Sequence, residues 1–228
     1  MGCGASTVRV EGDVFIVTNS GVSVKLALVE VQAVPGAEVA KFLKARIDAT
    51  ISESKNLQAA AEEASARISE ADQNLKKLSE EDERFFQLRL HRGQLGDADE
   101  LFGGLQRKRQ AAFEARGSWQ KKLDEVNARL AVCRSTSMYF RDLPPGVVSV
   151  KTDADGKFTL NLPRKQKVVL LAQARRQILD KTEFYYWMVP LVPDKNTTGR
   201  GFLSNDNLVN GTPEEIRTLF YWESASTS

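Results

Sequence analysis

The fold is decided by residues 147–176, which read VVSVKTDADGKFTLNLPRKQKVVLLAQARR. Apolar and polar residues alternate on both sides of the turn at residues 153–156, which is the pattern of half-buried strands. Two alternating runs around an Asp-Gly turn predict a β-hairpin. After Pro163, the run at residues 168–174 is almost entirely apolar, which is typical of a strand covered on both faces. The stretch therefore predicts three short strands.

Composition and charge limit the classes of protein to which the chain can belong. The chain has 228 residues, of which 42% are hydrophobic and 27% charged, so it can bury a core. Its 32 basic and 30 acidic residues leave a net charge of +2, whereas nucleic-acid binders usually carry a basic face. No apolar run reaches the length of about 18 residues that a transmembrane helix needs. Cys3 and Cys133 lie in an expected tail and an expected helix, so neither a disulfide nor a metal site is predicted.

The N-terminus, MGCGAST, offers two patterns for lipid attachment. Cys3, with small residues after it, resembles the mature start of a bacterial lipoprotein, in which the cysteine is acylated. Gly2 and Ser6 instead fit the myristoylation pattern M-G-x-x-x-[ST], with Cys3 as a palmitoylation site. One acyl chain holds a protein at a membrane only marginally, so stable anchoring needs two signals. The alternative is an unmodified, flexible tail over residues 1–7.

Residues 8–34 predict further strands. Val8 and Val10 alternate with their neighbours, residues 14–17 form an apolar run, and residues 19–21 are a turn signal. Residues 22–28 alternate again, and Pro35-Gly36 closes the stretch.

From residue 38 the apolar period becomes that of a helix. Residues spaced alternately by four and three form a heptad seam, typical of a coiled coil. The first seam comprises Leu43, Ile47, Thr50, Ser54, Leu57, Ala61, Ala64, Ile68, Ala71, Leu75 and Leu78. The second comprises Phe102, Leu105, Arg109, Ala112, Arg116, Trp119, Leu123, Val126, Leu130 and Cys133. A break is expected at residues 92–97, with Gly103-Gly104 as a second weak point, so the seams predict an antiparallel helical hairpin with an arm of about 70 Å.

Candidate sites lie mainly in the last third of the chain. Residues 183–189, EFYYWMV, predict an aromatic strand that Pro190 confines to a sheet edge or a short length. Tyr185, Tyr186 and Trp187 are a candidate platform for a sugar or a peptide, while the competing interpretation is core on one face of the strand. Residues 201–209 predict an ordered loop, and Thr212-Pro213 begins a short helix.

The remaining polar residues favour structural roles. His91 is the single histidine, and no arrangement of nucleophile and base is readable around it. Asp153, Asp155 and Gly156 favour a tight turn over a calcium loop, because Arg164 stands where such a loop needs glutamate. We predict no catalytic residue, no metal site and no cofactor.

Five residues of the deciding stretch match the pattern T-D-x-D-G-x-F: Thr152, Asp153, Asp155, Gly156 and Phe158. In this motif the chain resembles the carboxypeptidase regulatory-like domain, and its later segments EFYYWMVPLV and FLSNDNLV look like those of uncharacterised bacterial envelope proteins. The resemblance implies an antiparallel, transthyretin-like β-sandwich in which residues 22–35 supply an earlier strand. The expected fold class is therefore α+β, with the sandwich at residues 8–36 and 143–222, an inserted coiled-coil hairpin at residues 37–142, and tails at residues 1–7 and 223–228.

The resemblance implies a non-catalytic module, since members of that family are usually appended to enzymes or displayed on cell surfaces. The leading hypothesis is a bacterial cell-envelope protein, tethered to the membrane by a lipid on Cys3 and binding a protein partner through the hairpin. One alternative is an accessory module that binds carbohydrate or peptide through Tyr185, Tyr186 and Trp187. The other is a cytoplasmic assembly protein whose hairpin pairs between chains. None of these involves a nucleic acid.

Overall fold

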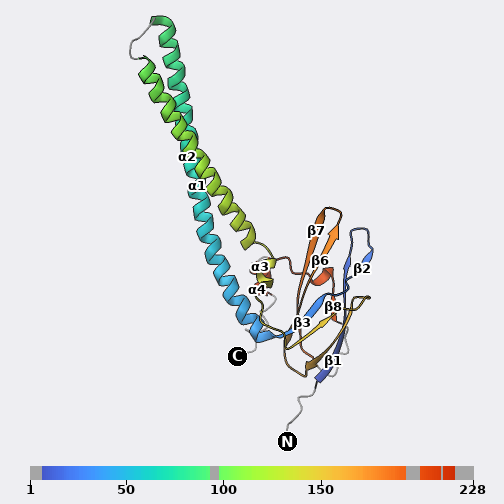
Figure 1. The fold of residues 1–228 in the computed structure, drawn as a ribbon. Helices are drawn as coiled ribbons and strands as arrows, with labels where there is room; N and C mark the ends of the chain where they lie inside the picture. The colour runs from blue at the N-terminus through green and yellow to red at the C-terminus, as the bar shows by residue number, and fades with distance from the viewer. Residues whose placement is uncertain (1–6, 93–97, 194–200, 212, 219–228) are drawn as a thin grey trace. The chain divides into compact units, whose positions relative to one another are not determined.

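The computed structural model describes residues 7–92, 98–193, 201–211 and 213–218 (Figure 1). It is a mixed α+β protein with antiparallel sheets, which confirms the fold class at that level. The chain divides into two compact units. We call Met1–Ile51 with Arg134–Ser228 the β unit, and Ser52–Cys133 the helical unit. The division falls inside the long helix α1 (Gly36–Arg92), and each unit is described by itself.

The first sheet of the β unit is organised around β1, which pairs with every other strand in it. Its members are β1 (Thr7–Val17), β2 (Ser23–Lys25), β5 (Lys157–Pro163) and β8 (Gly201–Leu203). β2 and β5 run antiparallel to β1, whereas β8 runs parallel to it. The strictly antiparallel arrangement that we expected is therefore wrong for β8, a strand that lies in the predicted loop at residues 201–209.

The second sheet has the order β4-β3-β6-β7 and is antiparallel throughout. Its members are β4 (Val148–Lys151), β3 (Glu30–Pro35), β6 (Val168–Ile178) and β7 (Lys181–Leu191). β7 is an edge strand, as the prolines predicted. The outer parts of β6 and β7 continue beyond β3 as a two-stranded ribbon, because β3 pairs only with residues 168–172 of β6.

The strands on either side of the Asp-Gly turn do not form the predicted hairpin. β4 pairs with β3 in the second sheet, whereas β5 pairs with β1 in the first. The turn therefore carries the chain from one sheet to the other. The prediction was wrong because other strands occupy the hydrogen-bonding groups around the turn. Val14 N donates to Gly156 O at 2.8 Å, and Leu28 N donates to Thr152 O at 3.1 Å.

The residues of the turn nevertheless act as tight-turn residues. The Asp153 carboxylate accepts hydrogen bonds from the backbone N–H groups of Asp155 and Lys157, at 2.9 and 2.8 Å. Gly156 has a φ of +73°, and a Cβ at this position would lie 2.6 Å from the carbonyl oxygen of Val14. Glycine is therefore required here both by the backbone conformation and by the available space.

The alternating run at residues 22–28 forms a shorter strand than predicted. β2 covers only Ser23–Lys25, and Leu28 takes a φ of +58°, which interrupts the extended backbone. The stretch at residues 22–35, expected to be one strand, therefore contributes β2 to the first sheet and β3 to the second.

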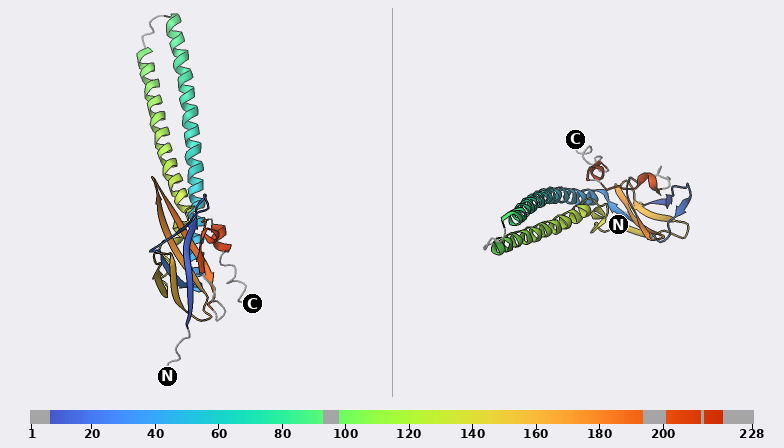
Figure 2. Two further views of the ribbon diagram at one scale, coloured as in Figure 1. Left: turned by 90° about the vertical axis from the view of Figure 1, so that its right-hand side faces the viewer. Right: turned by 90° about the horizontal axis from the view of Figure 1, so that it is seen from above.

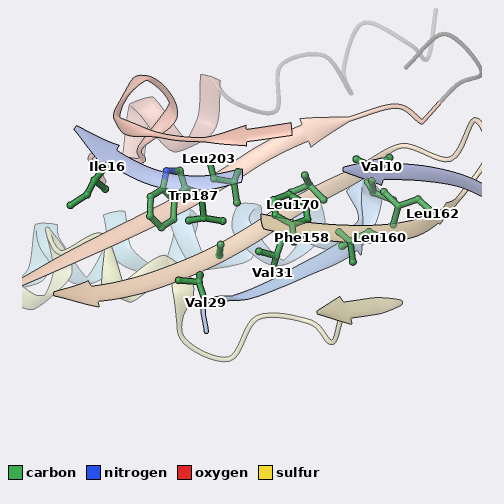
Figure 3. Close-up of a cluster of buried hydrophobic side chains, with 14 residues drawn as sticks. Val10, Ile16, Val29, Val31, Phe158, Leu160, Leu162, Leu170, Trp187 and Leu203 are labelled. Atoms are coloured by element: carbon green, nitrogen blue, oxygen red, sulfur yellow. The ribbon is translucent and has the colours of Figure 1, made fainter. Parts of the chain in front are cut away.

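An apolar core lies between the two sheets (Figure 3). Its members from the first sheet are Val10, Val14, Ile16, Phe158, Leu160, Leu162 and Leu203. Its members from the second sheet are Val31, Ala33, Val168, Leu170, Ala172 and Trp187. The inward residues of β5 alternate with exposed ones, as the sequence pattern predicted.

Helices of the β unit cover the outer face of the second sheet. The residues that this face contributes are Val34, Val169, Leu171 and Met188, and they pack with Val39, Leu43 and Ile47 of α1 and with Tyr139 and Phe140 of α3 (Ser137–Phe140). This second core explains why β6 is buried on both faces at residues 168–172, whereas the prediction extended to residue 174 and Gln173 is exposed.

In the helical unit, α1 and α2 (Ala98–Cys133) run side by side in opposite directions (Figure 2). Within this unit, the buried members of the predicted seams are Leu57, Ala64, Ala71, Val126, Leu130 and Cys133. Leu43 and Ile47, which were predicted to begin the first seam, pack against the second sheet instead, and Phe102 of the second seam is exposed. α2 continues through Gly103 and Gly104, so the second weak point is not a break. α1 ends at Arg92, and residues 93–97 of the predicted link lie outside the described ranges.

Ion pairs join the two helices at the polar positions of the second seam. Arg116 Nε lies 2.6 Å from Asp72 Oδ1, and Arg109 Nη1 lies 3.5 Å from Asp82 Oδ2. Towards the other end, Arg129 Nη2 lies 2.7 Å from a carboxylate oxygen of Glu53. From Glu53 to Asp72 to Asp82, the residue numbers of the α1 partners increase, while those of their α2 partners decrease from 129 to 116 to 109. This is the pairing order of two antiparallel helices, as the sequence predicted.

Short elements complete the β unit. The 3-10 turn η1 (Asn205–Asn207) follows β8, and α4 (Pro213–Thr218) lies where a short helix was predicted, although its expected cap, Thr212, is outside the described residues. The expected N-terminal tail, apart from Thr7, and the whole C-terminal tail also lie outside them.

Candidate functional site

The predicted platform of three aromatic residues on β7 requires a correction. Trp187 is fully buried in the core between the sheets, and its Nε1–H donates to the carbonyl oxygen of Ser204 at 2.9 Å. Tyr186 points to the other face of the strand and packs against Phe140, with ring centroids 4.9 Å apart. The three rings therefore do not share one exposed surface, because successive side chains of a strand alternate between its faces.

Of the three aromatic residues, Tyr185 lines a pocket. Its ring stacks on Trp187, with centroids 6.1 Å apart and planes 21° apart. Its hydroxyl donates a hydrogen bond to the Glu183 carboxylate. Partial burial raises the pKa of the Tyr185 phenol above its ordinary value, the nearby carboxylate raises it further, and Arg176 acts in the opposite direction. The phenol is therefore a neutral donor around neutral pH.

This pocket is an open groove of about 660 Å³ in the β unit. One wall comes from the end of β1 and the turn after it, residues 16–20, and the other comes from the β6–β7 ribbon. We call it the β1–β7 groove. It is lined on the ribbon side by Arg176, Ile178, Glu183, Phe184 and Tyr185, and at its inner end by Asn205 and Leu208.

On the ribbon side, the groove is lined mainly by one face of the strands, since Glu183 and Tyr185 are two residues apart and Arg176 is opposite Glu183. Phe184 belongs to the other face and also lines the groove, so the groove reaches the β7 strand itself at this position. Arg176 and Glu183 are opposite each other in the register of the ribbon, so a cation and an anion face each other across its strands. The sequence showed Arg176 only as a charged residue on a strand. Its partner in the groove, Glu183, lies on the neighbouring strand β7.

Asn205 closes the inner end of the groove. Its Oδ1 accepts a hydrogen bond from Val17 N at 2.6 Å, and its Nδ2 donates one to Val17 O at 3.0 Å. The side-chain amide therefore pairs with Val17 as the backbone of a neighbouring strand would. Ser204 before it caps η1 in a capping box. The sequence predicted an ordered loop here, but it did not show that the partner of this loop is the strand β1.

The helical unit presents a second candidate surface. Four of its exposed large apolar residues, Phe86, Leu101, Phe102 and Phe113, lie in the half of the unit next to the α1–α2 link and are between 45% and 60% exposed, whereas Val132 lies near the other end of α2. Arg109 lies over the ring of Phe113, 6.0 Å from its centroid. A groove of about 680 Å³ is lined by Glu81, Phe85, Leu101, Gly104, Leu105, Arg107 and Lys108. We call these four apolar residues and this groove the hairpin surface.

Cys133 behaves as a buried apolar residue of the seam. Burial raises the pKa of its thiol, and the charge of Glu53 raises it further, so the thiol is protonated and weakly nucleophilic. The side chain of His91 and the lipidation candidates Gly2 and Cys3 lie outside the described residues. Over the described residues, no group of three histidine, cysteine, aspartate or glutamate side chains is placed to hold a metal ion.

Comparisons with protein-family models, with curated proteins and with solved structures found no match for this chain. Within the described part of the chain, no helix combines the length and the apolar character that crossing a membrane requires.

Proposed function

We propose that this protein is a non-catalytic protein of the bacterial cell envelope that binds a protein partner through its helical hairpin. In fold terms, we propose a β-sandwich of the carboxypeptidase regulatory-like type with an antiparallel coiled coil inserted between two of its strands. The tether is a lipid on Cys3, with Gly2 as the alternative acceptor. The observation that carries the partner-binding role is the exposure of the four apolar residues of the hairpin surface.

The fold assignment is supported by the strand pairing and the shared core. Two sheets bury one apolar core between them, and α1 and α2 lie in the chain between β3 and β4, which are neighbours in one sheet. The coiled-coil assignment is supported by two seams of alternating four and three spacing and by the ion pairs at their polar positions.

The partner-binding role is supported by the cost of leaving large apolar side chains in water. Several large apolar side chains exposed on one part of a protein favour an interaction surface. Phe102 and Phe113 are eleven residues apart, which places them within about 20° of each other around the axis of α2. Aromatic residues on one helix face are typical anchors for a partner helix.

The charges beside the groove indicate what kind of partner fits. Arg107 and Lys108 line it together with Glu81, so cations outnumber anions there. The matching surface is an apolar helix face flanked by acidic residues.

Site-specific photo-crosslinking in the native cell tests this role. A photoreactive phenylalanine analogue replaces Phe102, Phe113 or, as a control, the exposed Ala66 on α1. We expect one defined protein adduct from the two phenylalanine positions and none from the control. Phe86→Ser should reduce the adduct, while circular dichroism shows unchanged helix content because this side chain is exposed.

The outcomes separate the alternatives. Adducts of similar yield from all three positions, or no adduct, would contradict a specific partner. An adduct between two copies of this chain would favour the assembly alternative, in which hairpins pair between chains.

The tether has its own test. Intact-mass spectrometry of the native protein should find an acylated N-terminus, and Cys3→Ser should release the protein from the membrane fraction. If only Gly2→Ala releases it, myristoylation is the anchor. An unmodified N-terminus in a membrane-free fraction would exclude both.

A further inference from the structure

We propose that the β1–β7 groove binds an extended peptide segment of a partner protein, which pairs with the outer edge of β7 next to Leu208. This site belongs to the β unit and is separate from the hairpin surface. It takes main-chain hydrogen-bonding groups as its ligand, with an apolar side chain seated in the groove.

The outer edge of β7 carries backbone hydrogen-bonding groups that point away from β6. In an antiparallel pair, alternate residues of a strand bond to the partner, and the others point away from it. Val209 N donates to Tyr186 O at 2.9 Å, so Tyr186 is a residue whose backbone points away from β6. By the same alternation, the backbone N–H and C=O groups of Phe184 and Thr182 also point outward. Over the described residues, no backbone partner pairs with them.

A segment of the chain itself already pairs with the inner part of this edge. Leu208 forms an antiparallel bridge with Trp187, so the short segment around it lies along the inner part of the β7 edge. A bound peptide at Phe184 would occupy the next positions along the same edge. Pro190 lies farther along β7 at an outward-pointing position, which shows that this edge tolerates a residue without an N–H.

The volume, burial and charge of the groove suit a peptide side chain. Its volume of about 660 Å³ lies in the range of ligand sites, and among its lining residues Ile16 is buried and Leu208 is partly buried. Arg176 and Glu183 contribute opposite charges. The groove therefore suits a peptide with one apolar side chain pointing inward and no charge requirement beside it.

These features favour a peptide over a carbohydrate. A sugar binds on the exposed face of an aromatic ring, but Trp187 is fully buried and Tyr185 stacks on it, with its hydroxyl already bonded to Glu183. A strand edge satisfies the main chain of any extended peptide, whereas the alternating side chains supply the selection.

The test uses the full chain and a phage-displayed library of random nonapeptides. Selected peptides are synthesised, and their affinities are measured by fluorescence anisotropy against two matched variants. Phe184→Thr removes the ring and keeps the backbone N–H, whereas Phe184→Pro removes both without breaking a bond to β6. We expect Phe184→Pro to bind at least about tenfold more weakly than Phe184→Thr, since both variants lack the ring and only the proline variant also loses a main-chain hydrogen bond.

A second measurement keeps the proposal falsifiable if the proline variant folds poorly. Hydrogen exchange of the wild-type chain is followed by NMR with and without saturating peptide. We expect the Phe184 and Thr182 amides to exchange at least about tenfold more slowly with peptide. No selected peptide, equal binding to both variants, or unprotected amides would overturn the proposal. Concentration-dependent protection without peptide would assign the edge to a second copy of this chain and would also overturn it.

Discussion

Replacing Thr152 by valine is the sharpest test of how the turn motif holds the two sheets. The side chain is 2% exposed, and its hydroxyl makes two bonds to the backbone between β2 and β3. Oγ1 accepts from Val29 N at 2.9 Å and donates to Leu26 O at 2.7 Å. Valine has nearly the same shape and no hydroxyl, so the substitution removes both bonds and leaves the packing in place.

The magnitude follows from the groups that lose their partner. A buried backbone group left without a hydrogen bond costs about 1–3 kcal/mol, and the Leu26 carbonyl is only partly buried, so we expect Thr152→Val to cost about 3 kcal/mol. Thr152→Ser keeps both bonds and loses one methyl group, which costs about 1 kcal/mol. The exposed Thr159 on β5 offers a control, and Thr159→Val should change the free energy of unfolding by less than about 0.5 kcal/mol.

Equilibrium unfolding in urea measures these differences. Trp119→Phe and Trp222→Phe are introduced as a common background, so the fluorescence comes from Trp187 in the core of the β unit. The reasoning is refuted if Thr152→Val is as stable as Thr152→Ser, since the hydroxyl would then carry none of the stability. It is also refuted if the valine variant matches the Thr159→Val control.

Three further predictions concern other parts of the chain. Leu179 is 92% exposed with a φ of +49°, so Leu179→Asn should raise the free energy of unfolding by about 0.5–1 kcal/mol, measured by the same urea transitions. Burial raises the pKa of the Tyr185 phenol above its ordinary value of 10.0. The contribution of this group to the free energy of unfolding is therefore present below pH 10 and is lost as the pH rises through the higher folded pKa. Above pH 10, Tyr185→Phe should lose stability with pH less steeply than the wild-type protein. In a Cys3→Ser background, the buried thiol of Cys133 should react with a disulfide reagent at pH 8 at least about tenfold faster in urea than in buffer, and equal rates would contradict its burial.

Local patterns in the sequence predicted the elements far better than they predicted the pairing. The buried run of β6 and the two long helices α1 and α2 were predicted because burial imposes a period on neighbouring residues. The Asp-Gly turn was also correct as a turn. The inference from turn to hairpin failed, because the bonds that decide it reach Val14 and Leu28, which are distant in sequence.

The candidate site shows the same limit. Tyr185 was singled out as part of an aromatic run, but the run divides between two faces of β7, and only the strand register shows which residue lines the groove. Asn205 and Leu208 define the inner end of the groove through partners on β1 and β7 that are not neighbours in the sequence. A pattern of period two indicates that a strand has two faces, but it does not indicate what covers its edge.

The polar positions of the helical unit have a physical reason of the same kind. Arg109 and Arg116 stand at positions of the second seam where apolar residues are usual, and their side chains remain 40% and 41% exposed. Each arginine faces an aspartate of α1, at 3.5 and 2.6 Å. Sliding one helix by a heptad would keep the apolar seam nearly unchanged, because small and apolar residues recur along it, but would separate both pairs. We therefore infer that these pairs fix the register of the hairpin, and with it the side-by-side placement of Phe85 and Leu105 on which the hairpin surface depends.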